Sequence, residues 1–150
     1  MIVQETTREE NISFLSSRRF GRLACAKDNQ PYLVPFHYAV SENHLYGFSM
    51  PGQKIDWMRK NAHVCVQVDE FSANREWRSV IVYGVYEEMP DTPQWQRNRS
   101  HALSSLQQHA NWWEPGDLKP ASAPPATAVL PVFFRIRIES LTGRHAFDQA

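Results

Sequence analysis

Hydrophobic and polar positions alternate along much of the chain with the two-residue period of a β-strand. Val64, Val66 and Val68, for example, share one face of such a segment. The alternation predicts strands at residues 20–27, 32–40, 44–49, 63–69, 77–88 and 128–140. Turn residues such as Asp28 separate the first three segments, which we therefore expect to form an antiparallel meander with tight connections.

Other stretches carry helical signals. Thr7 begins a capping box, which predicts a helix directly after it. A second helix is expected at 53–60, after a proline, and Thr92 is expected to precede a third. Gly143 is expected to end the last strand. Consecutive strands with short connections predict a mainly β (α+β) fold, an antiparallel barrel with peripheral helices, in a single domain over 1–150.

The centre of the longest predicted strand is apolar on both faces. Residues 80–86 read Val-Ile-Val-Tyr-Gly-Val-Tyr. A strand of a monomeric barrel normally has one face in the core and the other in water. The second apolar face needs a cover from a helix or from another subunit, and we favour a subunit. The sequence therefore predicts a homodimer.

The overall composition narrows the classes of function. The 150 residues include 16 basic and 16 acidic side chains, and this balance argues against binding to nucleic acid or an anionic membrane through bulk charge. The two cysteines, Cys25 and Cys65, stand among apolar residues and are expected to be reduced core thiols. The N-terminal residues lack the layout of a signal peptide, so a cytoplasmic location is expected.

One turn combines several features of an anion site. Residues 48–56 read as a strand end, a small-residue turn and a helix start, where unpaired N–H groups and the helix dipole favour an anion. Ser49 adds a hydroxyl, Gly52 allows close approach of the backbone, and Lys54 supplies a point charge suited to phosphate. The alternative is an ordinary capped helix with a solvated lysine.

Two further segments are candidates for ligand contact. Pro35 lies inside a predicted strand between Val34 and Phe36, and a proline there marks an edge, a bulge or a ligand-facing stretch. Arg78 and Ser79 place a cation and a hydroxyl at the start of the long strand. The alternatives are an edge strand with an incidental proline, and a surface cation beside a core tryptophan.

Four segments, in this order along the chain, resemble the FMN-binding split-barrel family related to pyridoxamine 5'-phosphate oxidase. They are residues 21–24, 31–38, 52–56 and 78–84. The nearer resemblance is to the branch that includes the 5-nitroimidazole-resistance (Nim-type) reductases. It covers about residues 8–90 well and the last strand loosely.

The resemblance implies an antiparallel split β-barrel and a homodimer with FMN at the subunit interface. It implies that the helix-start turn holds the phosphate, that the backbone of the proline segment flanks the isoalloxazine, and that the Arg-Ser pair lies near the ring. The cofactor-binding candidates are Val34, Pro35, Phe36, Ser49, Gly52, Lys54, Arg78 and Ser79. No catalytic residue is identified and no metal site is expected. One phosphate-type turn without a Gly-x-Gly-x-x-Gly fingerprint favours FMN over FAD.

The reaction is specified less closely. Phe48 stands where the Nim-type branch has a histidine, which argues against nitroimidazole reduction but not against FMN binding. Trp112 and Trp113 are interpreted as a plug over the barrel or as a wall above the flavin. The leading hypothesis is an oxidoreductase that uses FMN and NAD(P)H to reduce a small planar molecule. The alternatives are a non-catalytic flavin-binding or flavin-sensing protein, and a haem-binding split-barrel protein.

Overall fold

The computed structural model describes residues 1–108 and 130–149. Within these two ranges, three α-helices and a short 3-10 helix accompany eight strands. The elements are β1 (Ile2–Glu5), α1 (Arg8–Ser17), β2 (Phe20–Lys27), β3 (Gln30–His37), β4 (Ala39–Ser41), β5 (His44–Ser49), α2 (Gln53–Lys60), β6 (His63–Phe71), β7 (Trp77–Glu88), η1 (Pro93–Trp95), α3 (Gln96–Gln107) and β8 (Val132–Phe147).

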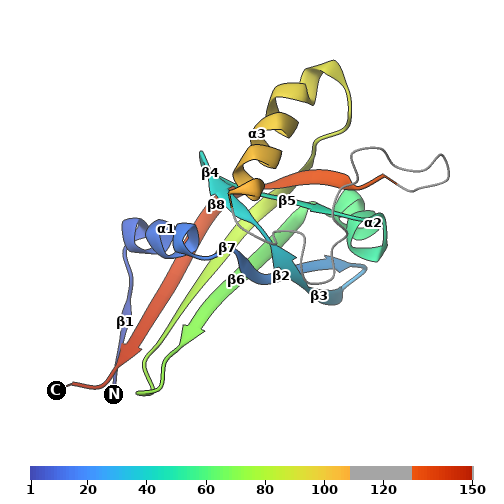
Figure 1. Ribbon diagram of the computed structural model, residues 1–150. Helices are drawn as coiled ribbons and strands as arrows, with labels where there is room; N and C mark the ends of the chain where they lie inside the picture. The colour runs from blue at the N-terminus through green and yellow to red at the C-terminus, as the bar shows by residue number, and fades with distance from the viewer. Residues whose placement is uncertain (109–129, 150) are drawn as a thin grey trace.

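The eight described strands form one antiparallel sheet, in which seven follow the order β3-β2-β6-β7-β8-β5-β4 and β1 pairs with β8 outside this order. Strand β8 is its centre, because it pairs with β7, with β5 and with β1. The strands β6, β7 and β8 run side by side as a long twisted ribbon, with both described ends of the chain at one tip (Figure 1). The mainly β fold expected from the sequence is confirmed.

The sheet curls into a barrel through residues 30–41. Strands β3 and β4 lie at opposite ends of the strand order, although only Tyr38 separates them in the sequence. One continuous stretch of chain therefore joins the two edges of the sheet. The expected three-strand meander is wrong in this respect, because β3 pairs with β2 while β4 pairs with β5. The bend at Tyr38 lets the same segment serve both partners.

The helices lie around the barrel. The predicted cap of α1 is confirmed, since the Glu10 N–H donates to Thr7 Oγ1 at 3.2 Å and the Thr7 N–H donates to Glu10 Oε2 at 2.9 Å. Helix α2 has the predicted bounds and packs on β2, with Ile55 and Met58 fully buried. Helix α3 packs on β4 and β5. No helix in the two described ranges is long and apolar enough to cross a membrane.

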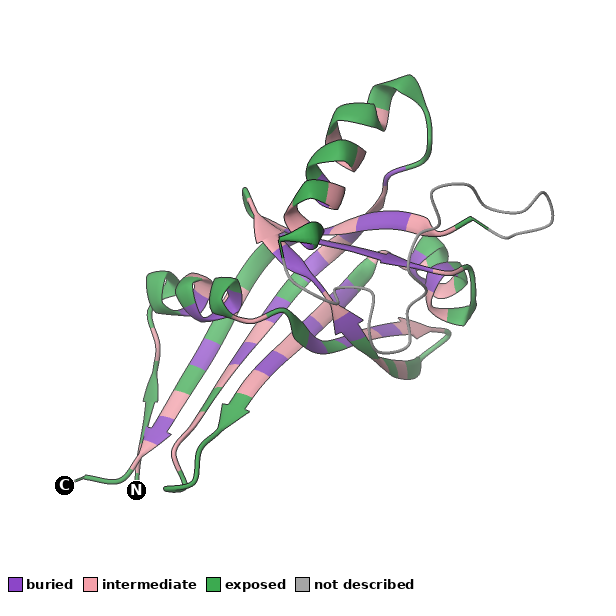
Figure 2. Ribbon diagram, in the orientation of Figure 1, coloured by how far each residue is buried: buried purple, intermediate pink, exposed green. Residues whose placement is uncertain are grey.

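The described core consists of two clusters of buried side chains. The larger one fills the barrel, and the smaller one lies between α3 and the strands beneath it. Burial alternates along β6, β7 and β8, as Figure 2 shows. On β6 the buried face carries Val64, Val66 and Val68, as predicted.

The long strand β7 has two faces of different character. Val80 and Val82 are buried, whereas the opposite face carries half-buried Ile81 and Val85 and the 48% exposed Tyr83. The predicted apolar second face therefore exists on the outside of the barrel in the single chain. What covers it remains a prediction.

Two features near the ends of the chain differ from expectation: the end of strand β8 and an additional strand, β1. Strand β8 continues to Phe147 and does not end at Gly143. An added Cβ at Gly143 would collide with the side chains of Asn11 and Thr6, so this glycine serves close packing against α1 rather than a turn. The short strand β1, which pairs with the end of β8, was not predicted.

Candidate functional site

The turn between β5 and α2 contains the predicted anion-site residues, of which Gly52 lines the cavity described below and Ser49 and Lys54 do not. Ser49 is buried at the end of β5, and its hydroxyl donates to the Met50 carbonyl at 2.9 Å. Gly52 is the N-cap of α2, and no side chain caps the helix start. An added Cβ at Gly52 would meet nothing nearer than the Met50 carbonyl at 4.0 Å. The first turn of α2 thus has backbone N–H groups that no side chain caps, which suits an anion.

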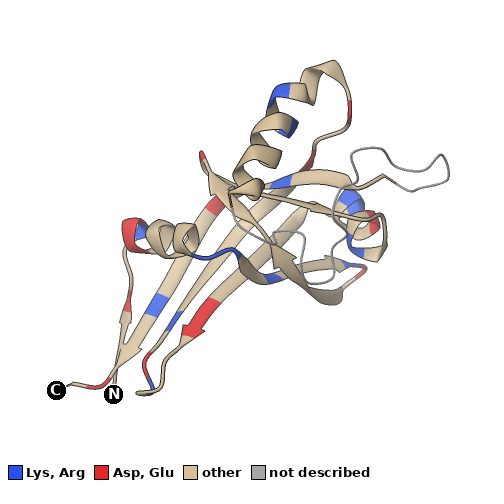
Figure 3. Cartoon of the chain, in the orientation of Figure 1, with Lys and Arg blue, Asp and Glu red and all other residues tan. Residues whose placement is uncertain are grey.

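A cavity of about 510 Å³ adjoins this helix start. Three basic side chains, from Lys27 at the end of β2 and from Arg59 and Lys60 on α2, line it together with one carboxylate, that of Asp56. Figure 3 shows basic residues gathered on α2. Arg59 is also held by Glu88, with its Nε 2.8 Å from Glu88 Oε1. The cavity therefore combines a helix start with an excess of positive charge, a combination that favours a phosphate group.

The anion turn lies next to β3. Burial raises the pKa of the Cys25 thiol, and the positive charge of Lys54 opposes that rise. Cys25 is paired in register with Tyr32 of β3. The Tyr32 ring meets the Trp57 ring of α2 with centroids 5.5 Å apart. The predicted phosphate-binding residues and the proline segment are thus neighbours in the fold.

In the proline segment, the side chains face in alternate directions. Val34 packs against the core, and Phe36 is buried with its ring stacked on Phe134 at a centroid distance of 5.6 Å. Phe36 also contacts the position where an added Cβ on Gly47 would lie, so β3 closes tightly onto β5. Pro35 is exposed. Because Phe36 belongs to the core, a ligand can meet this segment mainly through backbone atoms.

The structure places Arg78 and Ser79 away from this region. Tyr86, farther along β7, is bonded through its N–H to the Ala62 carbonyl just after α2, at 2.8 Å. At about 3.3 Å per residue, Arg78 lies roughly 26 Å from Tyr86 along the strand. A single chain therefore does not bring Arg78 and Ser79 to the anion turn.

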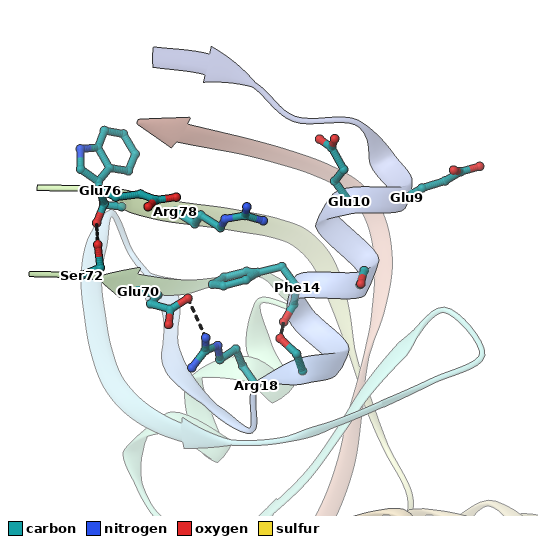
Figure 4. A pocket seen from close by; sticks show the side chains of 11 residues that line it. Glu9, Glu10, Phe14, Arg18, Glu70, Ser72, Glu76 and Arg78 are labelled. Atoms are coloured by element: carbon teal, nitrogen blue, oxygen red, sulfur yellow. Dashed lines mark hydrogen bonds and ion pairs between the residues drawn. The ribbon is translucent and has the colours of Figure 1, made fainter. Parts of the chain in front are cut away.

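Arg78 instead lines a second cavity, of about 680 Å³. Figure 4 shows Phe14 of α1 and Arg18, which directly follows α1, facing Glu70 of β6 and Arg78 of β7 across it. Arg18 is paired with Glu70 at 2.6 Å. The Ser79 hydroxyl lies outside this cavity and accepts from Gln67 Nε2 at 3.0 Å on the outer face of the sheet.

Sequence reasoning missed some residues beside the anion turn. Lys27, Trp57, Arg59 and Lys60 line the cavity but stand outside the segments singled out. The last three lie on the predicted helix, so their helical spacing was the available signal. Lys27 reaches the site only because the β2–β3 hairpin lies near α2.

The sequence analysis also singled out Phe48, the two cysteines and a pair of tryptophans. Phe48 is buried and stacks on Phe133 in the smaller cluster, at a centroid distance of 5.8 Å. Cys25 is buried, Cys65 is half-buried, and both thiols are free. Burial also raises the pKa of Cys65. Trp112 and Trp113 lie outside the described residues, so the two interpretations of this pair stay open.

The chain matches known proteins along nearly its whole length. The model of the pyridoxamine 5'-phosphate oxidase family matches residues 7–145. An uncharacterized protein of Rhizobium meliloti (strain 1021) is 48% identical over 146 residues, 97% of each chain. A crystal structure of an FAD-binding protein from Mesorhizobium loti is 52% identical, covers 98% of this chain and 100% of its own, and superposes with a TM-score of 0.81.

A structure described as a 5-nitroimidazole antibiotic resistance protein, from Bacteroides thetaiotaomicron, is similar in fold. It has a TM-score of 0.71 but only 18% identity, with 97% of this chain and 89% of its own covered. This likeness supports a shared fold and no closer relation. The expected nearness to the Nim-type branch is therefore reduced to a distant one.

Proposed function

Because the chain belongs to the pyridoxamine 5'-phosphate oxidase family, we propose that it binds a flavin nucleotide at the start of α2 and along β3. The observation that carries the proposal is the uncapped first turn of α2, which opens onto a cavity lined by Lys27, Arg59 and Lys60. Backbone N–H groups, the helix dipole and these cations together favour the phosphate of such a ligand.

We propose FAD rather than FMN as the nucleotide. The 52% identical relative from Mesorhizobium loti is described as an FAD-binding protein, which supports this choice. FAD carries one phosphate more than FMN, and Lys27 and Lys60 line the cavity beside the helix start, where a second phosphate could lie. FMN, which the single phosphate-type turn favoured, is the competing outcome of the test below.

The activity that fits this site best is electron transfer to a small planar molecule, with NAD(P)H as the donor. The flavin supplies the redox chemistry when it is bound, and the protein positions it and tunes its electronics. In this proposal Lys54 and the first turn of α2 hold the phosphate, while the β3 backbone orients the ring. The core around Phe36 forms a rigid wall behind β3.

We also propose that two copies of the chain associate through the outer face of β7, around Ile81 and Tyr83. This arrangement would allow Ser79, which shares that face, to act at the flavin of the other subunit, whereas Arg78 lies on the opposite face of β7, toward α1. Light scattering at micromolar concentration should give a dimeric mass, and Tyr83→Arg should give a monomer. A monomeric mass for the unmodified protein would refute the dimer.

The first test is the absorption spectrum of the purified protein, repeated on the supernatant after heat precipitation. Two broad flavin bands in the supernatant support non-covalent binding, and chromatography then distinguishes FAD from FMN. A sharp Soret band would replace the flavin with haem. A colourless protein that also fails to bind added FAD or FMN would refute the proposal.

A matched pair of variants tests the anion turn. Lys54→Gln should weaken flavin binding about tenfold or more, because a charge-assisted contact to phosphate is lost. Arg97→Gln removes the same charge from an exposed position on α3, and should leave the affinity unchanged. Equal affinities for the two variants would remove Lys54 from the site.

A further inference from the structure

The cavity of about 680 Å³ between α1 and the β6–β7 hairpin, which we call the α1 cavity, lies apart from the proposed flavin site. Its volume is within the range of sites that hold small organic molecules. Arg78, which has no role in the proposed function, lines it from β7. The Arg78 side chain is on the face of β7 opposite Ile81 and Tyr83, so the proposed contact between subunits does not cover it.

Most charged side chains of the α1 cavity are already bonded within the protein. Arg18 is paired with Glu70 at 2.6 Å. Glu76 Oε1 lies 2.6 Å from His145 Nε2. Glu10 Oε2 accepts a backbone N–H of the capping box at 2.9 Å. A ligand therefore meets chiefly the polar atoms that these bonds do not use.

Two groups of opposite charge remain available to a ligand. Arg78 forms no side-chain hydrogen bond or ion pair with any residue in the ranges 1–108 and 130–149. The second oxygen of the Glu10 carboxylate, Oε1, also has no partner within these ranges, although a carboxylate accepts several hydrogen bonds. Figure 4 shows Arg78 extending from β7 toward the wall that carries Glu10. The two charges thus belong to facing walls and form no ion pair with each other.

Phe14 adds an apolar surface beside these charges. It follows Glu10 by four residues, so the two side chains are neighbours on one face of α1. Figure 4 shows the Phe14 ring pointing from α1 toward the hairpin. The Arg18 guanidinium carbon lies 5.4 Å from the ring centroid, so a cation already covers part of the ring. A ligand that bridges Arg78 and Glu10 therefore has an aromatic side chain next to it.

We propose that the α1 cavity binds a small zwitterion, an α-amino acid with an apolar side chain. The ligand carboxylate accepts two hydrogen bonds from the planar guanidinium of Arg78, and the ligand ammonium donates to Glu10 Oε1. The apolar side chain packs on Phe14. Each charged end of the ligand thus meets the opposite charge on one wall of the cavity.

Other classes of ligand fit these charges less well. A metal ion is a poor occupant, since the described residues contain no group of three or more His, Cys, Asp or Glu side chains that could hold one. A simple organic cation leaves Arg78 unpaired and is repelled by it. A simple anion meets four lining glutamates against two arginines. A zwitterion alone matches both signs of charge.

Titration calorimetry on the full chain tests the two charge contacts. The probes are L-phenylalanine, its amide, which lacks the carboxylate, and N-acetylphenylalanine, which lacks the ammonium. We expect L-phenylalanine to bind about tenfold more tightly than either analogue, because each analogue loses one charge-assisted contact. Equal binding of L-phenylalanine and either analogue would overturn the proposal. So would the absence of L-phenylalanine binding at concentrations on the order of 10 mM.

Two variants assign each contact to its residue. Arg78→Gln should bind L-phenylalanine and its amide equally, since the partner of the carboxylate is gone. Glu10→Gln should bind L-phenylalanine and N-acetylphenylalanine equally, and it keeps the helix start because Gln also completes a capping box. Arg97→Gln, at an exposed position on α3, is the control and should keep both preferences. A preference that persists in Arg78→Gln or in Glu10→Gln would overturn the proposal.

Thermal melting checks that the variants fold. If either variant does not, the three titrations of the unmodified protein still decide the proposal. The titrations need no bound flavin, because the α1 cavity and the start of α2 share no residue. Failure to bind a flavin would therefore refute the proposed function alone.

Discussion

Removing the Tyr38 hydroxyl should loosen the corner where β3 turns into β4. Tyr38 is 1% exposed, and its hydroxyl donates to the Leu15 carbonyl at the end of α1 at 2.9 Å. In Tyr38→Phe this bond is lost. The carbonyl keeps one partner, the Arg18 N–H at 3.2 Å, so it is not left entirely unsatisfied. We therefore expect a loss of about 1 kcal/mol in the free energy of unfolding.

Urea unfolding and thermal melting measure this loss. A change of about 1 kcal/mol corresponds to a fall in Tm of about 2–4 °C for a chain of this size. Tyr46→Phe is the matched control, because Tyr46 is 2% exposed and its hydroxyl has no hydrogen bond among the described residues. It should cost less than about 0.5 kcal/mol. Equal losses in the two variants would refute the role of the hydroxyl.

The same group predicts a response to alkaline pH. Burial raises the pKa of Tyr38 above its ordinary value of 10. The unfolded chain then loses the proton first, so the unmodified protein loses stability as the pH rises above about 10. Tyr38→Phe lacks this group, and the gap between the two proteins should narrow from about pH 8 to about pH 11. A difference in unfolding free energy that stays constant with pH would contradict the raised pKa of Tyr38.

Three further variants have expected outcomes. Hydrogen bonds from Arg59 hold the pKa of Glu88 below its ordinary value of 4.5, so the Glu88 contribution is present above that pH and is lost as the pH falls through the lowered pKa. Glu88→Gln should therefore flatten the acid limb of stability measured by urea unfolding. Thr7→Ala should cost about 1 kcal/mol in thermal melting, because the capping box is lost. Gly47→Ala should cost roughly 1–3 kcal/mol in the same assay, since the added methyl group collides with the Phe36 ring; no loss would refute the tight closure of β3 on β5.

The sequence predicted those elements whose signals are local. Helix α2 and strand β7 have the predicted bounds, because a proline and a polar turn mark the start of the former and a long apolar run marks the latter. The break at Tyr38 could not be read from the same pattern. It exists because the two halves of the segment pair with strands at opposite ends of the sheet, which is a property of the closed barrel.

The missed end of the sheet has a similar cause. Strand β1 exposes three of its four residues, so its sequence carries no alternation of buried and exposed positions. Strand β1 is recognised as a strand only by its pairing with β8. Gly143 was a reasonable stop signal, but packing against Asn11 requires a residue without a side chain inside the strand. A glycine can end a strand, and it can also allow close packing inside a strand. Gly143 does the second, and the sequence alone does not distinguish the two.

Part of the candidate site was also local. Ser49, Gly52 and Lys54 are close in sequence, so one turn contains them, and their combination could be recognised. The wide separation of Arg78 from this turn depends on where β7 lies in the sheet.

The central place of β8 has a consequence for how the protein is made. Its partners β1, β5 and β7 all precede it in the chain, and it is the last strand to be synthesised. On a ribosome, β5 and β7 therefore each keep one edge of backbone N–H and C=O groups unpaired until residues 132–147 have left the exit tunnel. We expect the nascent chain to bind holding chaperones until β8 has emerged and paired with these strands.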